Sequence, residues 1–565
     1  MTADLTNLLW RIISLTWLTG PIFEKELRVC SRRKRNYVLR SAYLLLLTVL
    51  IASAWLRIML LGSGTSIAYR ISRMGELGKN LILTITWFQF IAAQLVAVVM
   101  LSNSVSDEIR RGTLDVLMTT PINSLQIVAG KLFSSLLQLT LLLAISLPLL
   151  AIVRVLGGMH WDYLVASLSI TFTAVLFTGS LTMLLSVRLR RPYMVILIML
   201  ILLVLAYSLA SILTVLLGSA KHTVTEALVL ANPAAAMLRV TYLTFPGRGF
   251  GGASFSWSLH CLIMISASTV VLLASALMIR RSTLARLRRT EDKMAVRALK
   301  RMVGLTGSGK APAATAAIRP VKGPVIIWKE LGRPISESVR SHTIVFLVLS
   351  VALILMCCLS RGAIMVYSIL TTGLWMIASV RTAAMAATTI AKEKEARTWP
   401  LLLGTTLDDR QIIRGKALAV LWRNLPLWLA IAVGMVAFFT FMVLFGRARG
   451  PGGSFFYCFY ILGGLITVGT HIVFLVAIGL YFSVRLKSAT AAVIATVGSV
   501  LGLFIAYRFL LPLIFGALMM VIAGRAFVGK YGGIILFYVV PSAVRLGIGL
   551  LLIQRAERQL RGNIF

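Results

Sequence analysis

Charged residues are scarce in this chain. Of its 565 residues, 13% are charged and 59% are hydrophobic, whereas a soluble domain carries about 25% charged residues. Most of the chain therefore cannot face water. Apolar runs of about twenty residues recur along it, each long enough to cross a bilayer as a helix, and they do not alternate as barrel strands do. We predict an all-α polytopic membrane protein.

Acidic residues are scarcer still, with 18 Asp and Glu against 57 Lys and Arg and a net charge of +39. None of the 18 falls inside an apolar run, so no carboxylate stands at membrane depth to relay or abstract a proton. This argues against a proton-coupled carrier and an intramembrane aspartyl protease. The basic residues collect at the ends of the apolar runs. The sequence has no basic stripe with interleaved aromatics, so we do not expect it to bind nucleic acid.

Histidine and cysteine number five each, without the spacing of metal ligands, and neither an HExxH nor a GxSxG motif occurs. Residues 304–310 (GLTGSGK) have the spacing of a phosphate-binding loop. However, Ala311 stands where a magnesium-binding hydroxyl belongs, and no strand precedes the loop. We therefore expect no catalytic residue, metal site or bound cofactor, and interpret this stretch as linker.

The apolar runs predict about twelve spans, in two sets of six: 37–57, 80–102, 132–156, 163–187, 193–217 and 257–279, then 342–359, 365–390, 417–445, 457–483, 489–524 and 533–553. The eleventh run is too long for one crossing, and we expect its helix to break before Arg508 and Pro512. An even number of spans puts both termini on one side. The loops of that side hold 39 of the 57 Lys and Arg, which predicts cytoplasmic termini.

Two six-span repeats, 1–280 and 323–565, flank a basic linker at 281–322. We expect residues 281–302 of this linker to form a basic helix that lies against anionic headgroups. The repeats align without gaps from 108–131 to 393–416, where eight of 24 positions are identical: Glu108/Glu393, Thr113/Thr398, Leu117/Leu402, Thr120/Thr405, Gln126/Gln411, Ile127/Ile412, Gly130/Gly415 and Lys131/Lys416. A duplication of this kind predicts two pseudo-symmetric halves with a pathway or interface between them.

Each repeat has two segments suited to the membrane face. The stretches 21–34 and 323–340 contain Lys-Glu-Leu after a short apolar patch, as an amphipathic elbow helix does. The loops 103–131 and 391–416 join the second span of each repeat to the third. In the first loop, Thr113 is placed to cap a short helix that ends before a proline. This helix is either an ordinary connector or a docking element for a cytoplasmic partner.

These segments resemble export-type ABC transporter permeases of the second type. The resemblance covers the whole chain as two tandem copies and is strongest over 104–150. It implies that separate cytoplasmic ABC ATPase subunits, in two copies, dock on the elbows and loops and supply ATP and magnesium. The docking residues it implies are Glu26, Glu108, Arg110, Gly112, Thr113, Leu114, Leu117, Pro121, Gly130, Lys131, Glu330, Glu393, Thr398, Gly415 and Lys416. The second copy departs from the pattern at Arg397 and Thr406, which replace the glycine and the proline.

Few polar residues interrupt the spans. Arg381 stands about eleven residues before Lys392 and therefore roughly 16 Å deep. With no acid in the span to pair with, it must face the bundle interior, a cluster of carbonyls, or water. Two interpretations stay open: a structural hydrogen bond, or a polar pathway that Arg381 lines together with Gln94, Arg423 and His471.

The sequence thus favours the permease subunit of an ATP-driven exporter, located in a bacterial cytoplasmic (inner) membrane. Its leucine-rich spans suggest a hydrophobic or amphipathic substrate. The alternatives are a secondary carrier, against which the missing carboxylates argue, and a membrane scaffold that couples an ATPase to another assembly without transport.

Overall fold

The computed structural model describes most of the chain. The described residues are 22–26, 28, 34–61, 67–113, 116, 119–120, 122–157, 160–189, 191–217, 227, 230–244, 255–302, 324–331, 343–354, 364–444, 453–505 and 539–560. Every regular element in these ranges is a helix. Eight of the described helices are long and apolar enough to cross a membrane. The chain is therefore an integral membrane protein.

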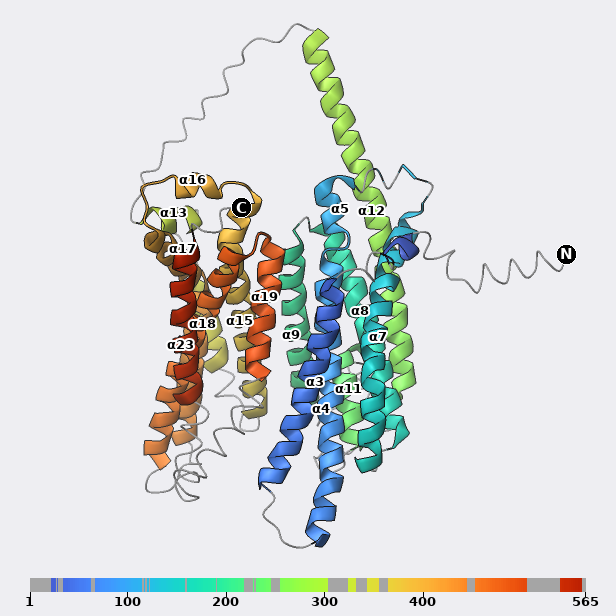
Figure 1. Ribbon diagram of the computed structural model, residues 1–565, viewed down its shortest axis with the longest axis vertical. Coiled ribbons are helices and arrows are strands. Elements are labelled where there is room, and N and C mark those ends of the chain that lie inside the picture. Colours follow the sequence, from blue (N-terminus) through green and yellow to red (C-terminus); the bar gives the residue numbers. More distant parts are fainter. Residues whose placement is uncertain are drawn as a thin grey trace, which may run out of the picture.

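We refer to the helices up to Met302 as the N-terminal part and to those after it as the C-terminal part (Figure 1). The N-terminal part contains α3 (Lys34–Leu61), α4 (Ile67–Ser102), α5 (Ser106–Arg111), α7 (Ser124–Gly157), α8 (Trp161–Arg188), α9 (Pro192–Leu217), α11 (Pro233–Thr244) and α12 (Trp257–Met302). The C-terminal part contains α13 (Val325–Leu331), α15 (Ile364–Glu395), α16 (Trp399–Leu403), α17 (Asp409–Leu444), α18 (Gly453–Arg485), α19 (Ala489–Ile505) and α23 (Val540–Gln559).

The eight candidate spans lie in α4, α7, α8, α9, α12, α15, α17 and α18, and each coincides with a predicted run. The other four predicted runs hold shorter described apolar helices at Arg40–Ala52, Thr343–Ile354 and Ala489–Leu503, and the charged helix α23. The helix of the eleventh run ends at Ile505, before Arg508, and the rest of that run lies outside the described residues. Twelve spans thus stay a prediction.

The two parts stand side by side as parallel bundles (Figure 1). They meet where α4 and α9 pack against α15 and α19 in one buried cluster. The N-terminal part contributes larger side chains to it, such as Tyr193 and Met199, and the C-terminal part contributes mostly alanines, such as Ala384 and Ala387. Small residues let helix backbones approach closely in a membrane, where packing rather than water expulsion drives association.

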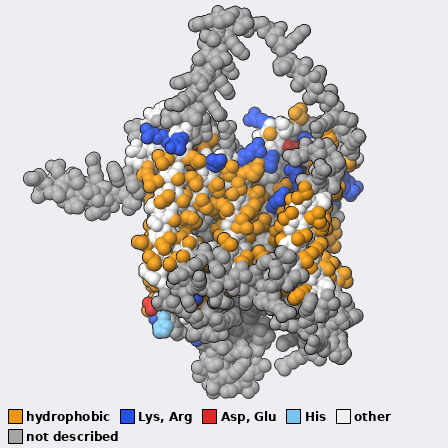
Figure 2. Space-filling view, turned by 180° about the vertical axis from the view of Figure 1, so that it is seen from behind, with side chains coloured by type: hydrophobic (Ala, Val, Ile, Leu, Met, Phe, Trp, Pro, Cys, Tyr) orange, Lys and Arg blue, Asp and Glu red, His pale blue; other side chains and the backbone are white. Residues whose placement is uncertain are grey.

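One end of the molecule carries α5, α13 and α16, and we call it the loop end. The described start of α3 and the end of α23 also lie there (Figure 1). Figure 2 shows a broad apolar belt around the middle of the bundles, with most of the visible Lys and Arg side chains next to its border at the loop end. This distribution is typical of a protein embedded in a bilayer.

Helix α12 differs from expectation. It runs without a break from its apolar part through residues 281–302, and this extension rises away from the bundle (Figure 1). The basic helix that we predicted is present, but it does not lie along the end of the bundle. The reason is local: no proline or glycine separates the span from the basic segment, so the helix continues in its own direction.

Helix α11 was not predicted, because it lies within the segment between two predicted spans. Asn232 begins it: its Oδ1 accepts the backbone N–H groups of Ala234 at 2.9 Å and Ala235 at 3.4 Å, and Pro233 occupies the first turn. The Asn-Pro pair is a helix-start signal that the sequence does contain. The helix packs its small residues against the N-terminal bundle.

Candidate functional site

A buried lysine organises the loop end of the N-terminal part. Lys131, at the start of α7, is only 5% exposed. Its Nζ lies 2.6 Å from Oε1 of Glu108 on α5 and 3.9 Å from Oε1 of Glu26 in the predicted elbow. It also donates to the backbone carbonyl of Ser104, 2.5 Å away. One cation thus joins the elbow, the loop and the third predicted span.

The same arrangement occurs in the C-terminal part. Lys416 on α17 is 1% exposed, and its Nζ lies 2.7 Å from Oε1 of Glu330 on α13 and 3.2 Å from Oε1 of Glu393 on α15. It donates to the carbonyl of Thr389 at 3.3 Å, and Arg423 donates to the carbonyl of Glu330. We call each lysine with its two glutamates a lysine clamp.

The two clamps have the same residue types, and these residues occupy aligned positions in the two repeats. Lys131, Glu108 and Ser104 each stand 285 residues before Lys416, Glu393 and Thr389, which is the offset of the sequence alignment. A buried ion pair of this geometry costs desolvation energy that a single attraction seldom recovers. Each lysine therefore gains from its additional partners, a second carboxylate and a backbone carbonyl.

A serine hydroxyl supports the chain just before each clamp. The Oγ of Ser186 on α8 accepts the backbone N–H groups of Val105 and Ser106 at 3.3 and 3.0 Å. The Oγ of Ser483 on α18 accepts those of Ile390 and Ala391, both at 2.9 Å. The donors again lie 285 residues apart. Sequence reasoning missed both serines, because they lie far from the loops along the chain.

The tips of the two loops also match. Gly112 ends α5 with a φ of 72°, and Arg397, the residue that replaces it in the second loop, takes a φ of 57°. Beyond them, Val116 is 67% exposed and Leu401 is 74% exposed. Trp399, at the start of α16, is buried. Each loop therefore presents an apolar side chain at its tip.

The helices that leave the loops begin in the same way. The backbone N–H of Asn123 donates to Oε1 of Gln126 at 3.2 Å, and that of Asp408 donates to Oε1 of Gln411 at 3.3 Å. This is the backward half of a capping box.

Gly415, which aligns with Gly130, lies close to the elbow of the C-terminal part. An added Cβ at Gly415 would stand 2.9 Å from the Ile326 side chain.

Some of the predicted docking residues are buried in the clamps, and others are exposed on the loops. Both clamps are internal: Glu26, Glu108, Glu330, Glu393, Lys131 and Lys416 point at one another. Thr113 and Thr398 are exposed and return hydrogen bonds to the carbonyls of Glu108 and Glu393. Gly130 is buried. Leu114, Leu117, Pro121 and the side chain of Arg110 lie outside the described residues.

No protein-family model matches this chain, and no curated protein is significantly similar to it. Within the described ranges, no three His, Cys, Asp or Glu side chains come together as a metal site would require.

Two of the four polar residues of the predicted pathway have local hydrogen-bond partners. Gln94 is buried in the N-terminal part, where its amide donates to Tyr207 at 3.0 Å and accepts from Thr178 at 3.4 Å. His471 bonds Ser379 at 3.0 Å and stacks on Trp375. These contacts favour the structural interpretation for both residues.

Arg423 is tied to the elbow through the Glu330 carbonyl, and Arg381 lies on α15. Both are partly buried. Gln94 lies in the N-terminal part and the other three residues lie in the C-terminal part, and a polar pathway lined by all four stays a prediction.

Charged and aromatic side chains also join the two parts near the loop end. Nζ of Lys392 on α15 lies 4.8 Å from the ring centre of Tyr193 on α9. Within the C-terminal part, Glu395 accepts the N–H of Ala489, which begins α19, at 2.9 Å. A hydrogen bond to Tyr193 and, to a lesser degree, the charge of Glu395 raise the pKa of Arg191 above its usual value. The contact of Lys392 with Tyr193 and the attraction between Glu395 and Arg191 join the parts at this end.

Proposed function

We propose that this chain is the membrane-spanning permease subunit of an ATP-driven ABC export system. Separate cytoplasmic ATPase subunits, two in number, would dock at the loop end and hold ATP and magnesium. The carrying observation is the repetition of the lysine clamp, in the same register and with the same partners, beneath two loops that each expose an apolar tip. A duplicated site of this kind suits a duplicated partner.

The exposed side chains Val116 and Leu401 supply the docking surface. Apolar residues that remain accessible at the water-facing end of a membrane protein mark an interaction site when they sit on a defined structure. Here a left-handed residue precedes each tip, and a lysine clamp lies behind it. Docking at both tips accounts for an Arg in the second loop that adopts the conformation of the glycine in the first.

The clamps explain how movement reaches the membrane. Each lysine ties the loop to the elbow and to the helix that follows the loop, α7 or α17. A displacement of the tip therefore moves packed helices as a unit rather than bending a flexible connector. The interface of α4 and α9 with α15 and α19 is where the two parts would rock to pass a hydrophobic or amphipathic substrate.

The finer features belong to the same proposal. Twelve spans in two six-span repeats place both termini in the cytoplasm, in accord with the basic residues at the loop end (Figure 2). The membrane would be a bacterial cytoplasmic membrane. The absence of Asp and Glu from the predicted spans supports an external energy source and disfavours a secondary carrier.

The test is affinity purification of the tagged full chain in detergent, followed by an ATPase assay on the proteins that accompany it. We expect the native chain to retain an ATP-hydrolysing partner and the double variant Val116→Asp, Leu401→Asp to lose it. The matched control, Val116→Ile with Leu401→Met, keeps the tips apolar and should retain the partner. Equal recovery of ATPase activity with all three proteins, or none with any, would refute the proposal.

A further inference from the structure

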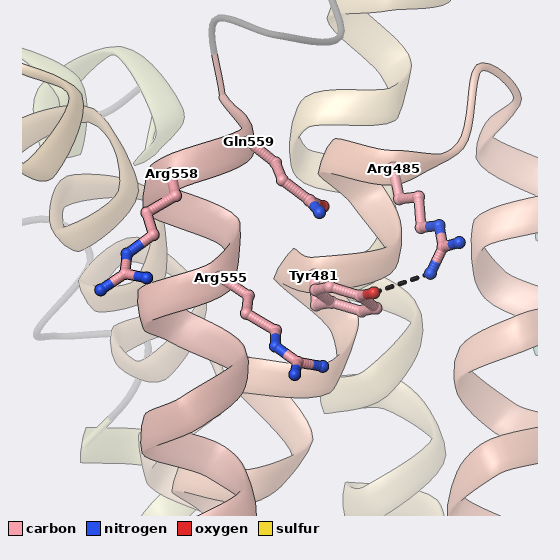
Figure 3. Close-up of a pocket in the computed structure, with 5 residues that line it drawn as sticks. All are labelled: Tyr481, Arg485, Arg555, Arg558 and Gln559. Carbon is pink, nitrogen blue, oxygen red and sulfur yellow. Dashed lines mark hydrogen bonds between the residues drawn. The ribbon is translucent and has the colours of Figure 1, made fainter.

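Two helix ends form a basic pocket at the loop end of the C-terminal part. Tyr481 and Arg485 line it from α18, and Arg555, Arg558 and Gln559 line it from α23. Figure 3 shows the side chains of Arg485 and Arg555 on either side of Tyr481, with the Gln559 amide directed toward the same space from α23. The pocket has a volume of 630 Å³, ample for a phosphate group and its substituents.

Packing along the whole length of the two helices fixes this convergence. Gly549 of α23 lies against the backbone of Phe474 and the methyl group of Ala477 on α18. Nearer the other end, Ser542 and Thr467 share a hydrogen bond of 3.2 Å. The arginines are therefore neighbours because of how the helices pack, and not merely because basic residues collect at span ends.

The charge of the pocket is unbalanced. Its described lining holds three arginines and no carboxylate. The acidic residue of this helix end, Glu557, is directed to α17, where its Oε2 lies 3.9 Å from Nε of Arg410. Figure 3 shows the Arg558 side chain directed away from Tyr481, so the guanidinium groups of Arg485 and Arg555 are the ones that face this space. These two groups repel each other, and an anion relieves that repulsion. Arginine prefers oxyanions with two or three coplanar acceptor oxygens, of which phosphate is the common biological example.

One guanidinium is already oriented. Nη1 of Arg485 donates to the hydroxyl of Tyr481 at 2.8 Å, and its Cζ stands 6.0 Å from the centre of the same ring. This bond uses one N–H and leaves the others available. An oriented arginine loses less conformational entropy when it binds a ligand than a freely rotating side chain does.

The outer face of α23 indicates where the anion comes from. Leu551 is 61% exposed and Leu550 is 51% exposed, and Leu551 precedes Arg555 by one helical turn on the same face. Gly547, one turn further along, has open space where a Cβ would stand. An apolar strip thus leads along the membrane-facing side of the helix to the arginines. Acyl chains fit the strip when a headgroup occupies the pocket.

We propose that this pocket binds a phosphate group, and that its source is the headgroup of an anionic phospholipid. Basic pockets between helices at a membrane border bind such headgroups by charge and by shape. The site is independent of ATPase docking, since it involves neither loop tip. It ties a lipid to the packing of α18 and α23.

Native mass spectrometry of the delipidated full chain in detergent tests this proposal. The probes are phosphatidylglycerol, phosphatidylcholine with the same acyl chains, and inorganic phosphate alone. We expect phosphatidylglycerol to bind about tenfold or more tighter than phosphatidylcholine. The variant Arg485→Gln, Arg555→Gln should lose that preference, since each arginine contributes to the attraction.

The matched control is Arg188→Gln with Arg414→Gln, which removes two exposed arginines outside the pocket. It should keep the preference, and all three proteins should unfold at similar temperatures. Equal phosphatidylglycerol binding by the two double variants would overturn the site. Binding of inorganic phosphate that the pocket variant abolishes, without any preference between the lipids, would overturn the lipid source and leave free phosphate as the ligand.

Discussion

At the scale of single residues, the clamps show how a membrane protein uses buried charge. Lys131 and Lys416 are nearly inaccessible, yet each meets carboxylates from two other segments. Removing one member of a buried ion pair is far more costly than never having had the pair, because the remaining charge stays desolvated. The clamp lysines are therefore structural groups on which the loops depend.

Replacement of Lys416 by Met should destabilise the protein by about 3 kcal/mol, because it leaves the carboxylates of Glu330 and Glu393 facing each other. The control is Lys329→Met: this lysine also pairs with Glu393, at 3.0 Å, but its side chain is 53% exposed. An exposed pair contributes roughly 0–1 kcal/mol. Thermal unfolding in detergent measures both, and equal losses would contradict a buried clamp.

The loop tips offer a second test. An added Cβ at Gly112 would meet no atom within 4 Å, so Gly112→Ala changes only the backbone energy at a φ of 72°. We expect a loss of about 1–2 kcal/mol. The reverse change, Arg397→Gly, should stabilise by about 1 kcal/mol. An unchanged unfolding temperature for Gly112→Ala would show that the loop does not require the left-handed conformation.

The sequence identified the paired residues but not their burial. The alignment of 108–131 with 393–416 selected Lys131 and Lys416, and the resemblance made them docking residues. Their burial depends on where the elbow packs, which no local pattern states. The hydrogen bonds of Ser186 and Ser483 could not be predicted for the same reason, since each serine is 80 or more residues from the N–H groups that it accepts.

At the scale of elements, the C-terminal bundle depends on the close approach of α18 to α15. An added Cβ at Gly479 would stand 2.5 Å from the Cβ of Ala386 and 3.0 Å from the backbone N of Ala387. Such distances leave no room for a methyl group. Helices in a membrane associate through this kind of contact, because lipid supplies little hydrophobic drive.

Gly479→Ala should therefore separate the two helices and cost about 1–3 kcal/mol through overpacking. Gly469 lies in the same helix with nothing within 4 Å of its Cβ position. Gly469→Ala should be neutral or stabilising by up to about 1 kcal/mol, since alanine is the better helix former. Unfolding midpoints of the two variants provide the comparison, and similar values would exclude tight packing at Gly479.

Long elements were predictable, and one short element, α11, was not. Continuous apolar runs predicted each of the described helices that is long and apolar enough to span, because hydrophobicity alone determines that a segment leaves water. Helix α11 was not predicted, because its twelve residues lie within a connecting segment and do not form a long apolar run. Only Asn232-Pro233 marks its start. The direction of α12 beyond its span also depends on its continuity rather than on its charge.

At the scale of the whole molecule, the two parts share one interface. Besides the buried cluster of α4, α9, α15 and α19, α9 and α15 approach closely at one further point. An added Cβ at Gly373 on α15 would lie 3.3 Å from the Cβ of Ser208 on α9. Disulfides join Cβ atoms about 3.5–4.5 Å apart, so this position accepts a cross-link after a small adjustment.

The variant Ser208→Cys, Gly373→Cys should form a disulfide on mild oxidation, visible as a linked peptide pair by mass spectrometry. If the parts rock against each other, the oxidised protein should lose stimulation of its ATPase, and a reductant should restore it. Ser208→Cys alone is the control for oxidation. A locked protein with full activity would contradict movement at this interface.

The central claim is that a separate ATPase docks on the loop tips, and photo-cross-linking from position 401 tests it most directly. A photoreactive amino acid replaces Leu401 in cells of the source organism, and Leu462, an exposed side chain of α18, serves as the lipid-facing control. The account predicts one protein product from position 401, an ATP-hydrolysing subunit, and none from 462. Only lipid adducts from both positions, or a partner that hydrolyses no ATP, would contradict it.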